Sequence, residues 1–423
     1  MTVTRLTNTP YGDEMRSPDP RVPIALACLA AATVLTAPGA AAATPVRPIL
    51  LTGPGLATSA VDISPLGVVV ANSGPAEAFP GEPAQEARPY RWTPRTDGTW
   101  ARRALPLPAD TTAAQVDGVT NAGAAGGAIY TAAGRTATRW PVSGAPQSIG
   151  GPTTQVTAVG PAQMLVETPP PGSFGGNLEL VRGDGSRVDI DAVVPNQQLV
   201  RGFFGSSVGG RDAAAFGVFG GAGMGSFVQP WIWVAGAGKA LPVQSTFFFG
   251  NACVGRIFPD GTQAYSGLGV VGEERRFLVG IHVGGVPGTE VELPVPEGEM
   301  GRLTCDYGTD AMASDGTVVG EVGTAGSTRA AVWRDGALTL IAPEGDETEV
   351  ESAAVATRGR VVIVATAADG TRQPYLWKDG VRRTLRLPAG LTLRDVVEFT
   401  DSGLVLANLA GADGAVKPVL WRT

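Results

Sequence analysis

Six of the eight tryptophans in this chain end one short pattern that recurs along the sequence. A polar or basic residue comes first, one or more hydrophobic residues follow, and Trp closes the pattern. The six positions are Trp92, Trp140, Trp233, Trp333, Trp377 and Trp421. Two further copies keep the frame without the Trp, at residues 177–181 and 277–282. The eight copies lie about 47 residues apart on average, and a period of about 40–50 residues is typical of a propeller or a solenoid.

Two other marks recur in phase with the tryptophans. Upstream of most copies lies a turn followed by an apolar run, as at Asp260-Gly261, Asp315-Gly316 and Ser402-Gly403. Downstream lies an alternating segment that often ends at a proline, such as Pro294 or Pro388. No part of the unit has helical periodicity. With one more strand before the turn, each copy holds about four strands, which is one propeller blade.

The repeat therefore predicts an all-β fold, a β-propeller of eight four-stranded blades. Seven blades are the alternative, with the weak third or fifth copy merged into a neighbour. The last copy ends at Trp421 without its fourth strand, and residues 46–54 have the pattern of that missing strand. We expect the N-terminal strand to complete the last blade, because such pairing leaves no open sheet edge. A linear solenoid would need polar caps, and none is apparent.

The first 43 residues have the pattern of a secretory signal peptide. Arg16 and Arg21 precede an apolar run at residues 22–36, and small residues at 40–43 supply a cleavage site. Met15 is an alternative start. The apolar run is too short for a spanning helix. We therefore expect a secreted, extracellular protein without a membrane span after cleavage, in which residues 44–423 form a single propeller domain, and we expect it to be a monomer.

Charge and cysteine content exclude several classes of function. The chain has 32 Lys and Arg against 39 Asp and Glu, a net charge of −7, and its basic residues do not cluster. A nucleic-acid partner is therefore not expected. Signal cleavage would leave Cys253 and Cys305, which lie near the same part of adjacent copies. A disulfide between them is our prediction, with two free buried thiols as the alternative. No Cys-x-x-Cys spacing points to zinc.

The repeat resembles that of secreted bacterial proteins with HAF-type extracellular repeats. Their unit reads roughly Asn-x-x-Gly-x-Val-Val-Gly, a loop, His-Ala-Phe-x-Trp, Gly and then Leu. Residues 314–340 and 358–387 match it best, although Arg, Gln, Lys or Thr stands where the unit has His. The resemblance covers most of residues 46–423. It implies a secreted β-propeller-like protein, and it brings no catalytic residues, cofactor or metal.

Three sets of residues are candidates for a site or for packing. The repeated tryptophans either pack between neighbouring sheets or form an aromatic binding ring. His282, the only histidine, occupies or adjoins a Trp position, so it either packs there or acts as a general base. Ser207 lies in a Gly-x-Ser-x-Gly sequence, with Asp260 and His282 downstream in the order of an α/β-hydrolase. That chemistry needs a strand-to-helix turn, and the following segment lacks a helical pattern.

Function on such a fold usually lies in the loops. Residues 73–88 form a long loop with Pro and Glu, which we interpret as solvated. Phe247, Phe248 and Phe249 are consecutive, so they form a candidate binding patch or pack beneath a Gly-rich loop. We predict a non-catalytic binding or interaction module for an extracellular ligand, a protein or a polysaccharide. The alternative is a propeller-fold hydrolase that acts on an extracellular glycan through paired carboxylates, which sequence alone does not locate.

Overall fold

The computed structural model describes most of the chain beyond its first 43 residues. All described residues belong to one unit, Ala32–Thr423. The described residues are 44–53, 57–74, 86–168, 176–194, 199–201, 207–209, 213–220, 227–235, 241–242, 253–271, 274–284, 289–304, 311–324 and 327–423. The predicted signal peptide, Phe247 to Phe249 and Cys305 lie outside these ranges, as does the side chain of Cys253.

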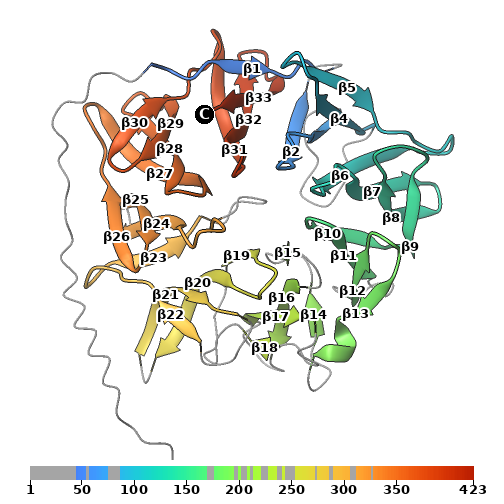
Figure 1. Ribbon diagram of the computed structural model, residues 1–423, viewed down its shortest axis with the longest axis horizontal. Helices are drawn as coiled ribbons and strands as arrows, with labels where there is room; N and C mark the ends of the chain where they lie inside the picture. The colour runs from blue at the N-terminus through green and yellow to red at the C-terminus, as the bar shows by residue number, and fades with distance from the viewer. Residues whose placement is uncertain are drawn as a thin grey trace, which may run out of the picture. The chain divides into compact units, whose positions relative to one another are not determined.

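The first four sheets in chain order are antiparallel and follow the first four copies of the repeat (Figure 1). Their strands are β2 (Thr58–Ile63), β3 (Val69–Ser73), β4 (Arg88–Pro94) and β5 (Trp100–Ala104); β6 (Ala113–Val119), β7 (Ala125–Thr131), β8 (Gly134–Trp140) and β9 (Gln147–Pro152); β10 (Gln155–Val159), β11 (Gln163–Thr168), β12 (Asn177–Arg182) and β13 (Arg187–Asp189); and β14 (Leu199–Arg201), β15 (Ser207–Gly209), β16 (Ala213–Gly220), β17 (Phe227–Val234) and β18 (Leu241–Pro242). A single 3-10 turn, η1 (Asp191–Val193), follows β13.

The remaining four sheets repeat the same order. Their strands are β19 (Cys253–Ile257), β20 (Gln263–Val271), β21 (Glu274–His282) and β22 (Glu290–Glu292); β23 (Met300–Leu303), β24 (Val318–Thr324), β25 (Ser327–Arg334) and β26 (Ala337–Ile341); β27 (Glu347–Ala356), β28 (Arg360–Ala367), β29 (Arg372–Lys378) and β30 (Val381–Thr384); and β31 (Leu391–Phe399), β32 (Leu404–Gly411) and β33 (Val416–Arg422) with β1 (Pro48–Leu50). The all-β prediction and the four-stranded units are confirmed. The sheet of β14 to β18 differs, because both β14 and β15 pair with β16 and give it five strands.

The weak third and fifth copies form sheets of their own, β10 to β13 and β19 to β22. The register explains why they keep the frame. Val318 lies opposite Trp333 in the sixth sheet, and Gln263 lies opposite His282 in the fifth. Both Val318 and Gln263 lie two residues after the glycine of the preceding turn. His282 therefore occupies the Trp position itself.

The N-terminal strand belongs to the last sheet. Ile49 lies opposite Leu420, and β1 lies beside β33 at the edge of that sheet (Figure 1). Just before β1, the Val46 N–H donates to Thr384 O at 2.9 Å, and Arg386 N–H donates to Val46 O at 3.0 Å. The segment thus hydrogen-bonds to the last two sheets and supplies β33 with a second neighbour.

Successive sheets pack against each other through apolar side chains. Each sheet contacts the one that follows it in the chain, for example through β2 and β6, β21 and β23, or β27 and β31, and β2 also contacts β31, β32 and β33. The largest clusters combine residues of two neighbouring sheets, as where Leu406 and Leu420 meet Val69 and Trp92. The core is therefore a series of separate layers, one between each pair of sheets.

Hydrogen bonds across these layers recur at fixed positions. The indole N–H of Trp140, Trp333 and Trp421 donates to Pro106 O, Pro294 O and Arg386 O of the preceding sheet at 2.8–2.9 Å. Asn72 and Asn408 each lie three residues after the residue that pairs with the Trp of their sheet. Their side-chain amides bind both the N–H and the C=O of one residue in the next sheet, at 2.7–3.0 Å. Each of these three indoles and two amides thus has a partner.

The described part of the chain contains no helix with the length and hydrophobicity needed to cross a bilayer.

Candidate binding pocket beside the β7–β8 hairpin

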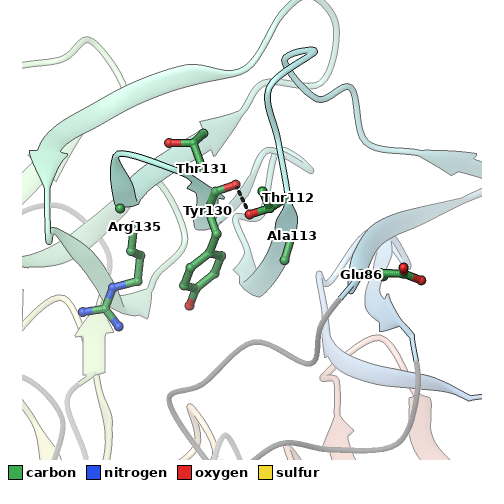
Figure 2. Close-up of a pocket in the computed structure, with 7 residues that line it drawn as sticks. Glu86, Thr112, Ala113, Tyr130, Thr131 and Arg135 are labelled. Atoms are coloured by element: carbon green, nitrogen blue, oxygen red, sulfur yellow. Dashed lines mark hydrogen bonds between the residues drawn. The ribbon is translucent and has the colours of Figure 1, made fainter.

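A pocket of about 450 Å³ opens beside the turn that joins β7 to β8 (Figure 2). Its lining residues come from three segments: Glu86, just before β4; Thr112 and Ala113, at the start of β6; and Tyr130, Thr131, Gly134 and Arg135, on the hairpin. The pocket therefore lies where the sheet of β2 to β5 adjoins the sheet of β6 to β9. Its size falls in the range of about 300–1,000 Å³ that is usual for small-molecule sites.

The register of the second sheet brings the hairpin residues together. Tyr130 lies opposite Ala113 on one side and opposite Arg135 on the other. Thr112 fixes this row, because its N–H and its hydroxyl both donate to Tyr130 O, at 2.9 and 3.0 Å. Residues directly opposite each other point to the same face of a sheet. Figure 2 shows the Tyr130 ring and the Arg135 side chain extending in the same direction.

Glu86 occupies the other side of the pocket in a constrained backbone conformation. Its φ is 69°, a region that residues other than glycine adopt infrequently. The next residues hold it there: Ala114 N–H donates to Ala87 O at 3.0 Å, and the Arg88 guanidinium donates to Thr112 O at 3.1 Å. Such conformations persist where the surrounding contacts fix them. The segment that enters β4 is therefore fastened to the one that enters β6.

Tyr130 and Arg135 both keep unused hydrogen-bonding capacity. The Tyr130 hydroxyl is enclosed, and it makes no hydrogen bond within the described residues. Burial raises the pKa of Tyr130, while the Arg135 charge opposes that shift and Asp117 reinforces it. Arg135 makes one long contact, from Nη2 to Thr153 O at 3.4 Å, and forms no ion pair with any described residue. The Arg135 guanidinium and the Tyr130 hydroxyl thus lie close enough to interact with each other, and neither is bound to a carboxylate of the described residues.

Asp117 lies close enough to Tyr130 to raise the pKa of Tyr130, and close enough to Arg135 for the Arg135 charge to lower the pKa of Asp117. It is the extra residue of a β-bulge between Val116 and Gly118, and bulges commonly re-aim a side chain. The bulge requires glycine on the neighbouring strand, because a Cβ at Gly127 would lie 2.2 Å from Gln115 O. Burial raises the pKa of Asp117 to about 7, against a hydrogen bond from Gln115 Nε2 at 3.2 Å and the charge of Arg135. This carboxyl therefore changes charge near neutral pH.

The chemistry of this arrangement favours recognition. A guanidinium matches a carboxylate in charge and shape, and the Tyr130 and threonine hydroxyls suit a ligand rich in oxygen. Glu86 is the only carboxylate among the lining residues, so the lining itself supplies no carboxylate pair of the kind that glycoside hydrolysis uses. Among the described residues, no group of three or more His, Cys, Asp or Glu side chains could hold a metal ion.

The residues singled out from sequence lie elsewhere. All six repeat tryptophans are buried, from 0 % exposure at Trp140 and Trp421 to 7 % at Trp377. His282 is 0 % exposed, and neither ring nitrogen has a hydrogen-bond partner in the described part of the chain. Ser207 begins the short strand β15 opposite Ala215, where an α/β-hydrolase would have a strand-to-helix turn. None of these residues lines the pocket.

Sequence reasoning missed the pocket, although one signal was present. Aligning the copies on their Trp positions places Tyr130 level with Gly74, Gly323, Thr366 and Ala410, so an aromatic residue stands where four other copies carry small ones. The fourth and fifth copies have Phe219 and Leu268 at this position. The sequence of residues 73–88 predicts a solvated loop. Glu86 from the end of that loop lines the pocket.

Comparison with known proteins adds no family. No protein-family model matches the chain, and a search of curated proteins finds no match. Solved structures that it resembles include the β-propeller domain of the trilobed protease of Pyrococcus furiosus, with 13% identity and a TM-score of 0.46 over 78% of this chain and 98% of that one. Another is the acylaminoacyl peptidase of Pyrococcus horikoshii, with 10% identity and a TM-score of 0.42 over 84% of this chain and 58% of that one. A prolyl endopeptidase has 10% identity and a TM-score of 0.45 over 86% and 50%.

Proposed function

We propose that this chain is a secreted, non-catalytic binding module that takes up an extracellular ligand in the pocket beside the β7–β8 hairpin. The observation that carries the proposal is that, among the described residues, the Arg135 guanidinium has no ion-pair partner and the enclosed Tyr130 hydroxyl beside it has no hydrogen bond. Burying such groups costs free energy unless a partner satisfies them. A bound ligand would supply that partner.

A glycan array probed with the secreted protein tests this proposal. We expect retention of a defined set of glycans, and unchanged glycans when the bound fraction is recovered. A matched variant, Arg103→Gln, removes an exposed arginine of β5 outside the pocket and should bind as the wild type does. Absence of binding to any glycan, or equal binding by a variant with Arg135→Gln, would contradict a glycan-binding role of this pocket.

We also propose that the eight sheets are the blades of one closed propeller. Two observations support closure: the chain of contacts returns from the last sheet to β2, and β1 pairs with β33. Removing residues 44–51 should expose the edge of β33 and strip buried Val46 and Leu51 from the core. We expect a lower unfolding midpoint and concentration-dependent association. A truncated protein that stays monomeric and equally stable would refute closure by this strand.

The sequence pattern supports three further proposals, which concern export, the type of repeat and the cysteines. We propose export by cleavage of residues 1–43, membership among proteins with HAF-type repeats, and a disulfide between Cys253 and Cys305. Mass spectrometry of the exported protein without reduction tests the first and the last together. We expect an N-terminus near residue 44 and no thiol that reacts with an alkylating reagent; two alkylated cysteines would reject the disulfide.

One observation favours the second candidate, a hydrolase that acts on an extracellular glycan. A carboxyl with a pKa near 7, such as Asp117, has the protonation that a general acid needs. Such carboxyls concentrate at functional sites. Turnover of a bound glycan that disappears with Asp117→Asn, while binding persists, would favour the enzyme over the binding module. Binding without turnover in the wild type would favour the module.

A further inference from the structure

We propose that the pocket beside the β7–β8 hairpin binds a saccharide that carries a carboxylate, with the Arg135 guanidinium on the carboxylate and the Tyr130 hydroxyl on a neighbouring oxygen. This inference rests on the proposed function and names the chemical class of its ligand. It concerns residues that lie in one cross-strand row, Ala113, Tyr130 and Arg135.

The surroundings of Arg135 indicate that the ligand carries a negative charge. On β4, beside the pocket, Arg88 and Arg91 donate to backbone carbonyls. In other sheets, three arginines bind carboxylates: Arg329 binds Glu299, Arg372 binds Glu351, and Arg382 binds Glu347 at 2.7 Å. Arg135 has no such partner among the described residues, yet it is half-buried and lines the pocket. An arginine held in this way is suited to a planar anion, because two parallel N–H groups match two carboxylate oxygens.

The remaining lining groups indicate that the ligand carries several hydroxyl groups. Among the described residues the enclosed Tyr130 hydroxyl has no hydrogen-bond partner, so it is available to donate to or accept from a ligand oxygen placed beside it. The Thr131 hydroxyl accepts from Ala133 N–H at 3.2 Å, which leaves its own proton for a further acceptor. A ring with several hydroxyls satisfies such a set, whereas an aliphatic carboxylic acid leaves it unsatisfied. The volume of about 450 Å³ holds one to a few sugar rings.

Asp117 makes anion binding depend on pH. The charged or titratable groups on the elements packed around it are Asp62 on β2, Arg88, Tyr90 and Arg91 on β4, Tyr130 on β7, and Arg135 and Arg139 on β8; β3 and β10 contribute none. Asp62 accepts from Val119 N–H at 2.6 Å, and Arg91 donates to three backbone carbonyls. Ionised Asp117 attracts Arg135 and repels a ligand carboxylate, and protonation removes both effects. Affinity for an acidic saccharide should therefore rise as the pH falls from 8 to 6.

Isothermal titration of the full exported chain tests the proposal. The probes are oligogalacturonate and oligoglucuronate, each beside its carboxyl-reduced, neutral counterpart. We expect the acidic probes to bind at least tenfold more tightly than the neutral ones at pH 6, and Arg135→Gln to abolish that preference. Equal affinity for acidic and neutral probes would overturn the inference while leaving the proposed binding function standing. No binding of any saccharide would overturn both.

Two substitutions separate a binding role from a structural one. Tyr130→Phe removes only the hydroxyl, which has no partner in the described protein, so the unfolding midpoint should stay the same or rise while affinity falls several-fold. Asp117→Asn should leave the affinity at pH 6 near the wild-type value and remove its pH dependence. Tighter binding of sulfated than of carboxylated probes, unaltered affinity in Tyr130→Phe, or a pH dependence that survives in Asp117→Asn would each overturn the proposal as stated.

Discussion

Trp333 and His282 hold the same position in their sheets, but only Trp333 satisfies its ring nitrogen. Trp333 is 1 % exposed, and its indole N–H donates to Pro294 O of the preceding sheet at 2.8 Å. His282 is equally buried, and neither of its nitrogens has a partner among the described residues. The comparison shows that the position accepts either flat ring, whereas the hydrogen bond across the layer is a separate contribution, made by Trp140, Trp333 and Trp421 and absent at His282 among the described residues.

The largest expected effect comes from removing the ring where the contact is complete. Trp421 is 0 % exposed and donates to Arg386 O at 2.9 Å, so Trp421→Ala creates a large cavity between the last two sheets. We expect a loss of about 3–5 kcal/mol in the free energy of unfolding, measured by chemical denaturation. The exposed Val381→Ala serves as a control and should change little. A loss in Trp421→Ala no larger than that control would show that the ring does not hold the layer together.

The side-chain hydrogen bonds between neighbouring sheets should contribute less to stability than the tryptophans, and the contribution should depend on the number of bonds. Asn408 holds both the N–H and the C=O of Ala60 on β2, at 2.7 and 3.0 Å. Ser266, at the same position in the sheet of His282, accepts one bond from Leu303 N–H at 3.0 Å. We expect Asn408→Ala to cost about 2–3 kcal/mol and Ser266→Ala about 1 kcal/mol, because unpaired buried backbone groups carry the penalty. A larger loss of stability in Ser266→Ala than in Asn408→Ala, measured by chemical denaturation, would contradict this prediction.

His282 should make the protein sensitive to acid. Burial lowers the pKa of His282 in the folded state, and the neighbouring Glu290 opposes that shift. The unfolded chain therefore binds the proton more readily, so stability falls as the pH drops below the ordinary histidine value of about 6.5. His282→Phe should keep the ring, remove both unsatisfied nitrogens and flatten this dependence. Unfolding midpoints of wild type and variant between pH 5 and 8 that run parallel would reject the prediction.

Asp117 should produce the opposite slope, with the smallest net effect at neutral pH. Its folded-state pKa of about 7 lies above the unfolded value, so the folded chain binds the proton more readily. The resulting stability is fully present below about pH 4 and is lost as the pH rises through 7. Asp117→Asn should remove that loss and gain on the order of 1 kcal/mol at pH 8, since the half-buried side chain is partly hydrated. A variant that is less stable than wild type at pH 8 would contradict this.

The second and third strands of each copy were the most predictable part of the fold. Trp140 and Trp333 mark them with the same spacing of 17 residues from the glycine of the preceding turn, Gly123 or Gly316, and strand order follows from short connections between antiparallel neighbours. The extra strand β15 was not predictable, because the Gly- and Ala-rich sequence around Ser207 carries no alternation that would distinguish a strand from a loop.

The binding pocket could not be assembled from the sequence for a different reason. Glu86, Thr112 and Arg135 lie in three separate segments, and none of them belongs to a motif with a fixed chemical role. Their meeting depends on the packing of one sheet against the next. Asp117 is an ordinary aspartate in the sequence, and its raised pKa is a consequence of the bulge and of burial, which are properties of the folded chain.

The sequence by itself determined that this protein consists of repeated four-stranded sheets, most of them carrying a buried flat ring, because periodic apolar patterns and glycine turns are local properties of the chain. The tertiary structure alone decided what lies between the sheets: the partners of the indoles, the hydrogen bonds between Asn408 and Ala60, and the juxtaposition of the Arg135 guanidinium and the Tyr130 hydroxyl. These contacts join residues from different copies, and their energies depend on burial and distance, which no single copy encodes.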